Sequence, residues 1–197
     1  MHSTLRAEEW FKLFKERYEG NKRLEVENEH AYSQRMAYLI HSMAEEMELD
    51  CVCCVREGKE GDAEQLLDVG FTWLPSYNAY HLPLAVIEHV NSPDFDELHD
   101  AYWKVASVRA PLRVVIGYME ADGDREEYIT DLNRLLQINH LPQDGSDELI
   151  ILGLWDDWHL AGWARTGKVN EFLPIEAFLA FERDFKEVEE ALERTSK

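Results

Sequence analysis

The chain has 197 residues, with 20 Lys and Arg against 40 Asp and Glu, and its formal net charge at pH 7 is −20. Apolar residues make up 45 %, which is enough for one hydrophobic core and excludes a wholly disordered chain. The longest apolar run, residues 149–155, is far shorter than the roughly 20 residues that a helix needs to cross a bilayer, so no membrane span is predicted. The N-terminal segment is charged throughout, unlike a signal peptide.

Two amphipathic helices open the predicted fold. Apolar residues recur at helical spacing over residues 4–19 and again over 30–49. The second pattern contains a stripe of methionines, which is typical of a helix face that packs into a core. Three strands are then predicted at residues 51–56, 66–74 and 82–90, the last two joined by a hairpin loop.

Helices and strands alternate in the second half of the chain. Ser92 and Pro93 are typical of a helix start, so a helix is predicted from there to about residue 108. An apolar strand at 113–118, a helix at 124–139, a hairpin formed by 149–155 and 159–165, and a last helix opened by Pro174 complete the pattern. The sequence therefore predicts a single α/β domain over residues 1–197, with a mixed central sheet flanked by helices.

All three cysteines, Cys51, Cys53 and Cys54, lie within four residues of each other in the first predicted strand. Their odd number and close spacing disfavour a disulfide framework and point to a reducing, cytoplasmic location. Because no CxxC or HxxxH pair elsewhere completes a zinc site, we interpret them as small apolar side chains of a buried strand.

Charge is distributed unevenly along the chain. A protein with this large negative charge repels a polyanion at long range. Any nucleic-acid site on it must therefore be a local basic patch. Residues 120–160 hold eleven acids against two arginines, whereas residues 101–119 hold Lys104, Arg109 and Arg113 and no acid. We therefore expect Arg109 and Arg113 to contact phosphate if the protein binds nucleic acid.

Two acids lie in the predicted second and third strands. Glu88 interrupts an apolar run, where a carboxylate is costly unless it is paired or holds a cation, and Asp68 has a similar place in the preceding strand. A hairpin can bring the two side by side, and paired carboxylates are ligands for Mg²⁺. A bound Mg²⁺ can activate water and neutralise a phosphoryl transition state, while Lys104 on the following helix can stabilise developing charge.

The order helix, three strands, helix, strand resembles the core of the PD-(D/E)XK nuclease-like superfamily, the restriction-endonuclease-like fold. The segment AVIEHVNS, followed by DELHDAYWK, is similar to members whose lysine has moved from the third strand to the next helix, since Val90 stands at the usual lysine position. The resemblance covers residues 30–118 and implies an αβββαβ core. Residues 119–197 are then an elaboration that adds a β-hairpin and a helix.

This resemblance implies roles for individual residues. Asp68 and Glu88 match the two metal-binding acids, Lys104 takes the role of the lysine, and Asn91 matches the asparagine after the third strand. A glutamate on the first core helix often joins such sites, and Glu46 is the candidate because it flanks the methionine stripe.

Structural roles remain open for the same residues. Glu88 can form an ion pair with Arg109 or Arg113, Asp68 can bond backbone amides at a strand start, and Lys104 can be an exposed helix residue. The three histidines nearest Glu88 have no shared ligand spacing, and His89 points to the strand face opposite Glu88.

Two functions from different classes follow. The first is a Mg²⁺-dependent phosphodiester hydrolase, or a degenerate relative, that acts on nucleic acid. The second is a non-catalytic acidic protein, of the immunity, anti-defence or DNA-mimic type, whose charge engages a basic protein partner. The sequence favours neither an oligomeric state nor a substrate sequence.

Overall fold

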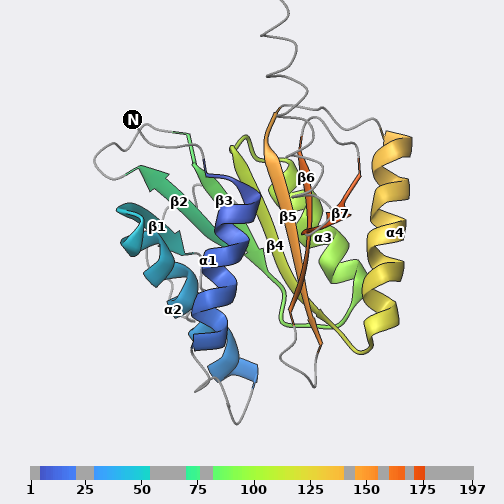
Figure 1. The fold of residues 1–197 in the computed structure, drawn as a ribbon, viewed down its shortest axis with the longest axis horizontal. Coiled ribbons are helices and arrows are strands. Elements are labelled where there is room, and N and C mark those ends of the chain that lie inside the picture. Colours follow the sequence, from blue (N-terminus) through green and yellow to red (C-terminus); the bar gives the residue numbers. More distant parts are fainter. Residues whose placement is uncertain are drawn as a thin grey trace, which may run out of the picture.

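The computed structural model describes residues 5–20, 29–53, 70–75, 82–139, 145–154, 160–166 and 171–175. Within these ranges the protein is an α/β fold in which helices cover both faces of a mixed sheet (Figure 1). The elements are, in chain order, α1 (Ala7–Gly20), α2 (Glu29–Glu46), β1 (Leu49–Cys53), β2 (Phe71–Pro75), β3 (Ala85–His89), α3 (Phe95–Ala106), β4 (Leu112–Met119), α4 (Asp122–Asn139), β5 (Asp147–Leu154), β6 (Ala161–Thr166) and β7 (Leu173–Pro174).

The seven strands found in the described ranges lie side by side in the order in which they occur in the chain. β1, β2 and β3 are antiparallel neighbours, β3, β4 and β5 run parallel, and β5, β6 and β7 are again antiparallel. The parallel steps need crossovers, which α3 and α4 provide. The antiparallel pairing of the second and third strands and the C-terminal hairpin were both predicted and are confirmed.

Each face of the sheet has its own hydrophobic core. Buried residues of α1 and α2 pack on one face, with Trp10, Phe14, Met36 and Ile40 fully buried. The other face is covered by α3 and α4. Strand β4 is buried along its whole length, as its continuous apolar sequence predicted for a strand enclosed between two helical layers.

Several predicted boundaries differ from the observed ones. α3 begins at Phe95 with Asp94 as its N-cap, not at Ser92, because the Asp94 carboxylate accepts a hydrogen bond from the Asp96 amide at 2.8 Å. Pro174 lies at the end of the short strand β7, a place where proline's missing donor is tolerated. Ile175 after it is helical, and the rest of the predicted helix lies outside the described residues. None of the helices in the described ranges is long and apolar enough to cross a membrane.

Candidate functional site

Glu88 is a half-buried carboxylate near the end of β3. Its neighbours at alternate positions, Val86 and Val90, pack in the core beneath α3, so the Glu88 side chain points to that same face. Its side chain is 15 % exposed, with Oε2 accepting a hydrogen bond from the Gly70 amide at 2.5 Å and Oε1 lying 3.5 Å from Nζ of Lys104. Glu88 therefore sits where β2, β3 and α3 meet.

Lys104 reaches Glu88 because α3 returns across the sheet after β3. Leu98, Ala101 and Val105 form the buried face of α3, and Lys104 lies at the border of that face, with 44 % of its side chain exposed. The predicted convergence of Lys104 on Glu88 is thus observed. The alternative ion pair between Glu88 and Arg113 is not observed. The Arg113 guanidinium contacts Glu148 and the carbonyl oxygen of Val108 instead.

Asp68 lies outside the described residues, two positions before Gly70. Gly70 stands opposite Glu88 across the β2–β3 pair, in continuation of the Phe71–Ile87 register. A Cβ at position 70 would lie 3.2 Å from Oε2 of Glu88 and 3.4 Å from the carbonyl oxygen of Ile87. The absence of a side chain at Gly70 therefore permits the short contact between its amide and the carboxylate.

Glu46 and Asn91 have partners other than Glu88. Glu46 forms an exposed ion pair with Arg17 of α1, at 2.5 and 2.6 Å, on the face of the sheet opposite Glu88. Nδ2 of Asn91 donates to Oγ of Ser33 at 3.1 Å and so joins the end of β3 to α2. The structure does not bring either residue into contact with the Glu88–Lys104 pair.

The two arginines predicted to contact phosphate lie in different surroundings. Arg109 is exposed in the turn between α3 and β4. Arg113 is buried, its Nε donating to the carbonyl oxygen of Val108 at 2.9 Å and its Nη1 to Oγ of Ser146. Only Arg109 is therefore placed on the surface, where it can meet a phosphate.

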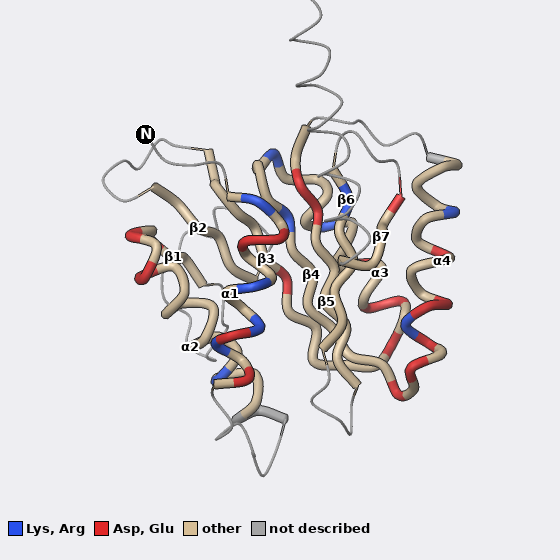
Figure 2. The backbone as a smooth tube through the Cα atoms, viewed as in Figure 1, with Lys and Arg blue, Asp and Glu red and all other residues tan. Residues whose placement is uncertain are grey.

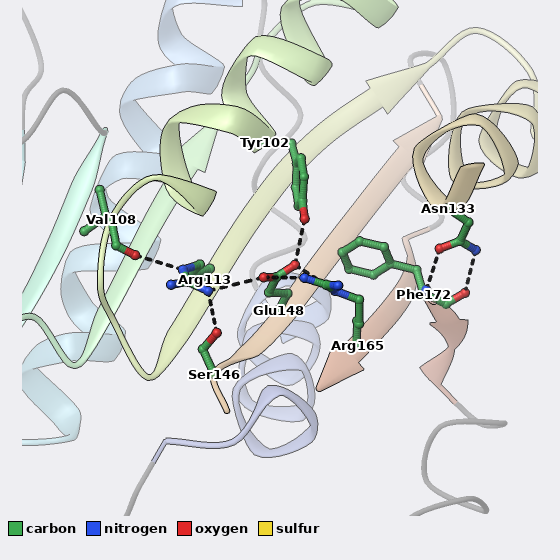
Figure 3. Close-up of polar contacts among 8 residues, drawn as sticks. All are labelled: Tyr102, Val108, Arg113, Asn133, Ser146, Glu148, Arg165 and Phe172. Atoms are coloured by element: carbon green, nitrogen blue, oxygen red, sulfur yellow. Dashed lines mark hydrogen bonds and ion pairs between the residues drawn. The ribbon is translucent and has the colours of Figure 1, made fainter. Parts of the chain in front are cut away.

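A buried charge network at the start of β4 and β5 and the end of β6 accounts for Arg113 (Figure 3). Glu148 is 4 % exposed and accepts hydrogen bonds from both nitrogens of the Arg165 fork, at 2.9 and 3.1 Å, and from the Tyr102 hydroxyl at 2.9 Å. Nη1 of Arg113 lies 3.3 Å from the same carboxylate. Burial and the Glu148 charge raise the pKa of Tyr102, so its phenol remains a donor. Sequence reasoning missed this network, whose only signal was polar residues at the ends of apolar strands.

His89 is satisfied on the opposite face of β3, as its strand position predicted. Its Nε2 lies 3.2 Å from the Tyr118 hydroxyl, which also bonds to the hydroxyl of Tyr32. Tyr32 in turn lies 3.3 Å from the Tyr18 hydroxyl, so that α1 and α2 are joined to the sheet by a buried chain of polar groups. Burial lowers the pKa of His89 to about 4, which keeps the imidazole neutral at pH 7.

Among the residues described, no three His, Cys, Asp or Glu side chains are grouped so that they could hold a metal ion. The described ranges thus supply one acid, Glu88, of the predicted metal pair. Comparison of the chain with protein-family models, with curated proteins and with solved structures finds no match.

Proposed function

We propose that this protein is a Mg²⁺-dependent phosphodiester hydrolase that acts on nucleic acid, with its site at Glu88, Lys104 and Asp68. The observation that carries the proposal is the meeting of Glu88 Oε1 and Lys104 Nζ at 3.5 Å, beside the start of β2. An acid and a lysine that lie 16 positions apart are the pair that the sequence singled out for this chemistry.

The arrangement of α2 to β4 supports the same proposal. An antiparallel sheet of three strands follows α2, and α3 then leads to a fourth strand parallel to the third. This is the element order that the resemblance to PD-(D/E)XK nucleases implies, and it positions Glu88 on the third strand and Lys104 on the following helix.

The donors near Glu88 fit a hard divalent cation. Each carboxylate oxygen has more than one acceptor direction, so one oxygen can accept a hydrogen bond and bind a metal at the same time. Mg²⁺ prefers carboxylate oxygens and keeps several waters. Asp68, the second acid of the proposal, precedes Gly70 by two positions in the sequence, and the Gly70 amide contacts Glu88.

In this proposal each residue has a distinct task. Glu88, held by the Gly70 amide, and Asp68 bind the ion, which supplies positive charge to the developing phosphoryl transition state. The Lys104 ammonium, on an exposed stem, exchanges from Glu88 to the phosphate and stabilises its negative charge. Exposed Arg109 contacts a neighbouring phosphate of the strand.

The test combines metal titration with a cleavage assay. Calorimetric Mn²⁺ titration should give heat with the wild-type protein and much less with Glu88→Gln or Asp68→Asn, and the same substitutions should abolish Mg²⁺-dependent cleavage of single- or double-stranded substrates. Lys104→Met should lower cleavage by about 10²-fold or more with metal binding retained. Because the Lys104 side chain is exposed and lies 3.5 Å from Glu88, the free energy of unfolding should change by less than about 1 kcal/mol.

Asp100→Asn is the matched control, since Asp100 is an exposed carboxylate on α3. It should leave metal binding and cleavage unchanged. A wild-type protein that binds neither Mn²⁺ nor Mg²⁺ would remove the hydrolase proposal, and cleavage that survives both acid substitutions would show that other residues carry it.

A second candidate function, docking to a basic protein, is favoured by α4. Its exposed surface carries Asp122, Glu126, Glu127 and Asp131, whereas Arg125 is buried against Asp122, and the acidic positions run along the helix in Figure 2. A stoichiometric basic partner should then co-purify with the wild-type protein and be lost when the four carboxylates are changed to amides. Retention of that partner by the fourfold variant would exclude α4 as the docking surface.

A further inference from the structure

Sulfur-bearing side chains gather where α2 packs on β1. Three methionines of this region, Met36, Met43 and Met47, belong to or pack against the core on the α1–α2 face, and so do the thiols of Cys51 and Cys53. Met36 and Met43 are fully buried, whereas Met47 and both cysteines are half-buried. This layer is therefore rich in soft donors and close to solvent at one side.

The two thiols lie on the same face of β1. Residues i and i+2 of a strand point in the same direction, so Cys51 and Cys53 project together toward α2 while Asp50 is exposed. Neither cysteine forms a disulfide. Two thiol sulfurs one strand repeat apart are thus presented side by side.

A buried donor adjoins Cys51. Trp73 is the residue directly opposite Cys51 in the β1–β2 pair, and it is fully buried. Apart from the Cys51 sulfur, its indole Nε1–H has no acceptor within the described residues, so a sulfur that carries negative charge at Cys51 would be a stronger acceptor for it. Burial and the neighbouring Cys53 raise the pKa of the Cys51 thiol to about 12, and the Trp73 donor acts in the opposite direction. A cation bound between the two sulfurs offsets part of the cost of holding thiolate charge at this half-buried place.

We propose that Cys51 and Cys53 together bind one soft monovalent cation of the Cu(I) class. Thiolate and thioether surroundings select soft ions over Mg²⁺ or Ca²⁺, and two sulfurs suit an ion of low coordination number. Binding breaks both S–H bonds, forms two S–metal bonds and releases two protons, so a site that is neutral as two thiols carries one net negative charge with the ion bound. The Trp73 N–H then donates to the bound Cys51 sulfur, as neighbouring donors do at other metal–thiolate sites.

This site is independent of the proposed hydrolase site. Cys51 and Cys53 face the α1–α2 core, whereas Glu88 points to the opposite face of the sheet. Glu88→Gln should therefore leave binding of the soft cation unchanged.

The test uses Cu(I) itself, supplied without oxygen and in competition with a chromogenic Cu(I) chelator. The wild-type protein should bind one equivalent and release about two protons per ion at pH 7. Cys51→Ser and Cys53→Ser should each weaken binding by about 100-fold or more, and Cys54→Ser should stay within about 3-fold of the wild type. X-ray absorption of the wild-type complex should show two sulfur ligands, which tests the site even if a serine variant folds poorly.

Wild-type Cu(I) affinity in Cys51→Ser or Cys53→Ser would overturn the proposal. So would a loss in Cys54→Ser as large as in the other two variants, or X-ray absorption that shows oxygen or nitrogen ligands in place of the two sulfurs.

Discussion

The adjacent residues Glu88 and His89 of β3 point to opposite faces of the sheet. Glu88 points toward α3, remains partly exposed and meets Lys104, whereas His89 points toward α1 and α2 and bonds to the Tyr118 hydroxyl. Successive side chains of a strand point to opposite faces of the sheet, so the sequence alone predicted this separation. What the sequence did not reveal is that Tyr118, Tyr32 and Tyr18 form a buried chain with His89, because these residues come from three other elements.

The half-buried His89 should make the protein sensitive to acid. The unfolded chain binds a proton near the ordinary pKa of 6.5, whereas folded His89 does not until about pH 4. Its contribution to stability is therefore complete above pH 6.5, falls as the pH drops to 4, and is lost below that, by up to about 3 kcal/mol. Urea unfolding at pH 7, 5.5 and 4 should show this loss in the wild type and not in His89→Phe. An exposed-histidine control, His41→Gln, should retain the loss, and an acid profile of His89→Phe equal to that of the wild type would contradict the assignment.

At the scale of elements, α3 positions the candidate site. Asp94 caps its first turn, and Leu98 and Val105 belong to its buried face. With the helix packed in this way, Lys104 lies beside Glu88. α3 packs closely against β4 at Gly117, which has no side chain. A Cβ at this position would lie 2.1 Å from a methyl carbon of Leu98. The amphipathic pattern predicted the helix, but neighbouring Ser92 and Asp94 are both good N-caps, and only the path of the chain from β3 selects Asp94.

Removing the N-cap should weaken α3 by a measurable amount. Asp94→Ala leaves the Asp96 amide without its acceptor, so the free energy of unfolding should fall by about 1 kcal/mol in urea titration. Asp100→Ala, a substitution of an exposed residue in the middle of the same helix, should cost less than about 0.5 kcal/mol. Equal losses in both variants would show that Asp94 does not act as the cap.

For the whole molecule, the buried network joins the sheet to the α3 layer. Glu148 neutralises one of two buried guanidinium groups and takes a hydrogen bond from Tyr102 of α3, so strands β4, β5 and β6 and helix α3 depend on one carboxylate. Pairs of this kind are expensive to break, because removal of one partner leaves the other charge buried without compensation.

Glu148→Gln should therefore be strongly destabilising. Loss of the carboxylate charge beside Arg113 and Arg165 is expected to lower the free energy of unfolding by about 3–5 kcal/mol, measured by denaturant titration at pH 7. Glu127→Gln on the exposed surface of α4 should change it by less than about 0.5 kcal/mol. A Glu148→Gln protein as stable as the wild type would mean that the network is solvated and not structural.

The sequence by itself determined the order of the elements, the mixed sheet and the face toward which each strand residue points. These follow from short-range periodicity, and β4 and α3 were predicted in nearly the observed positions. It also singled out Glu88 and Lys104, because a charge within an apolar run needs a partner and the next helix must cross the same strand.

Only the tertiary structure decided which of several available partners each charge has. Arg113 pairs with Glu148 and not with Glu88, and Glu46 pairs with Arg17 on the other face of the sheet. The physical reason is that ion pairing acts over a few ångströms between residues far apart in the chain. It therefore depends on strand register and helix packing, which local sequence patterns do not specify.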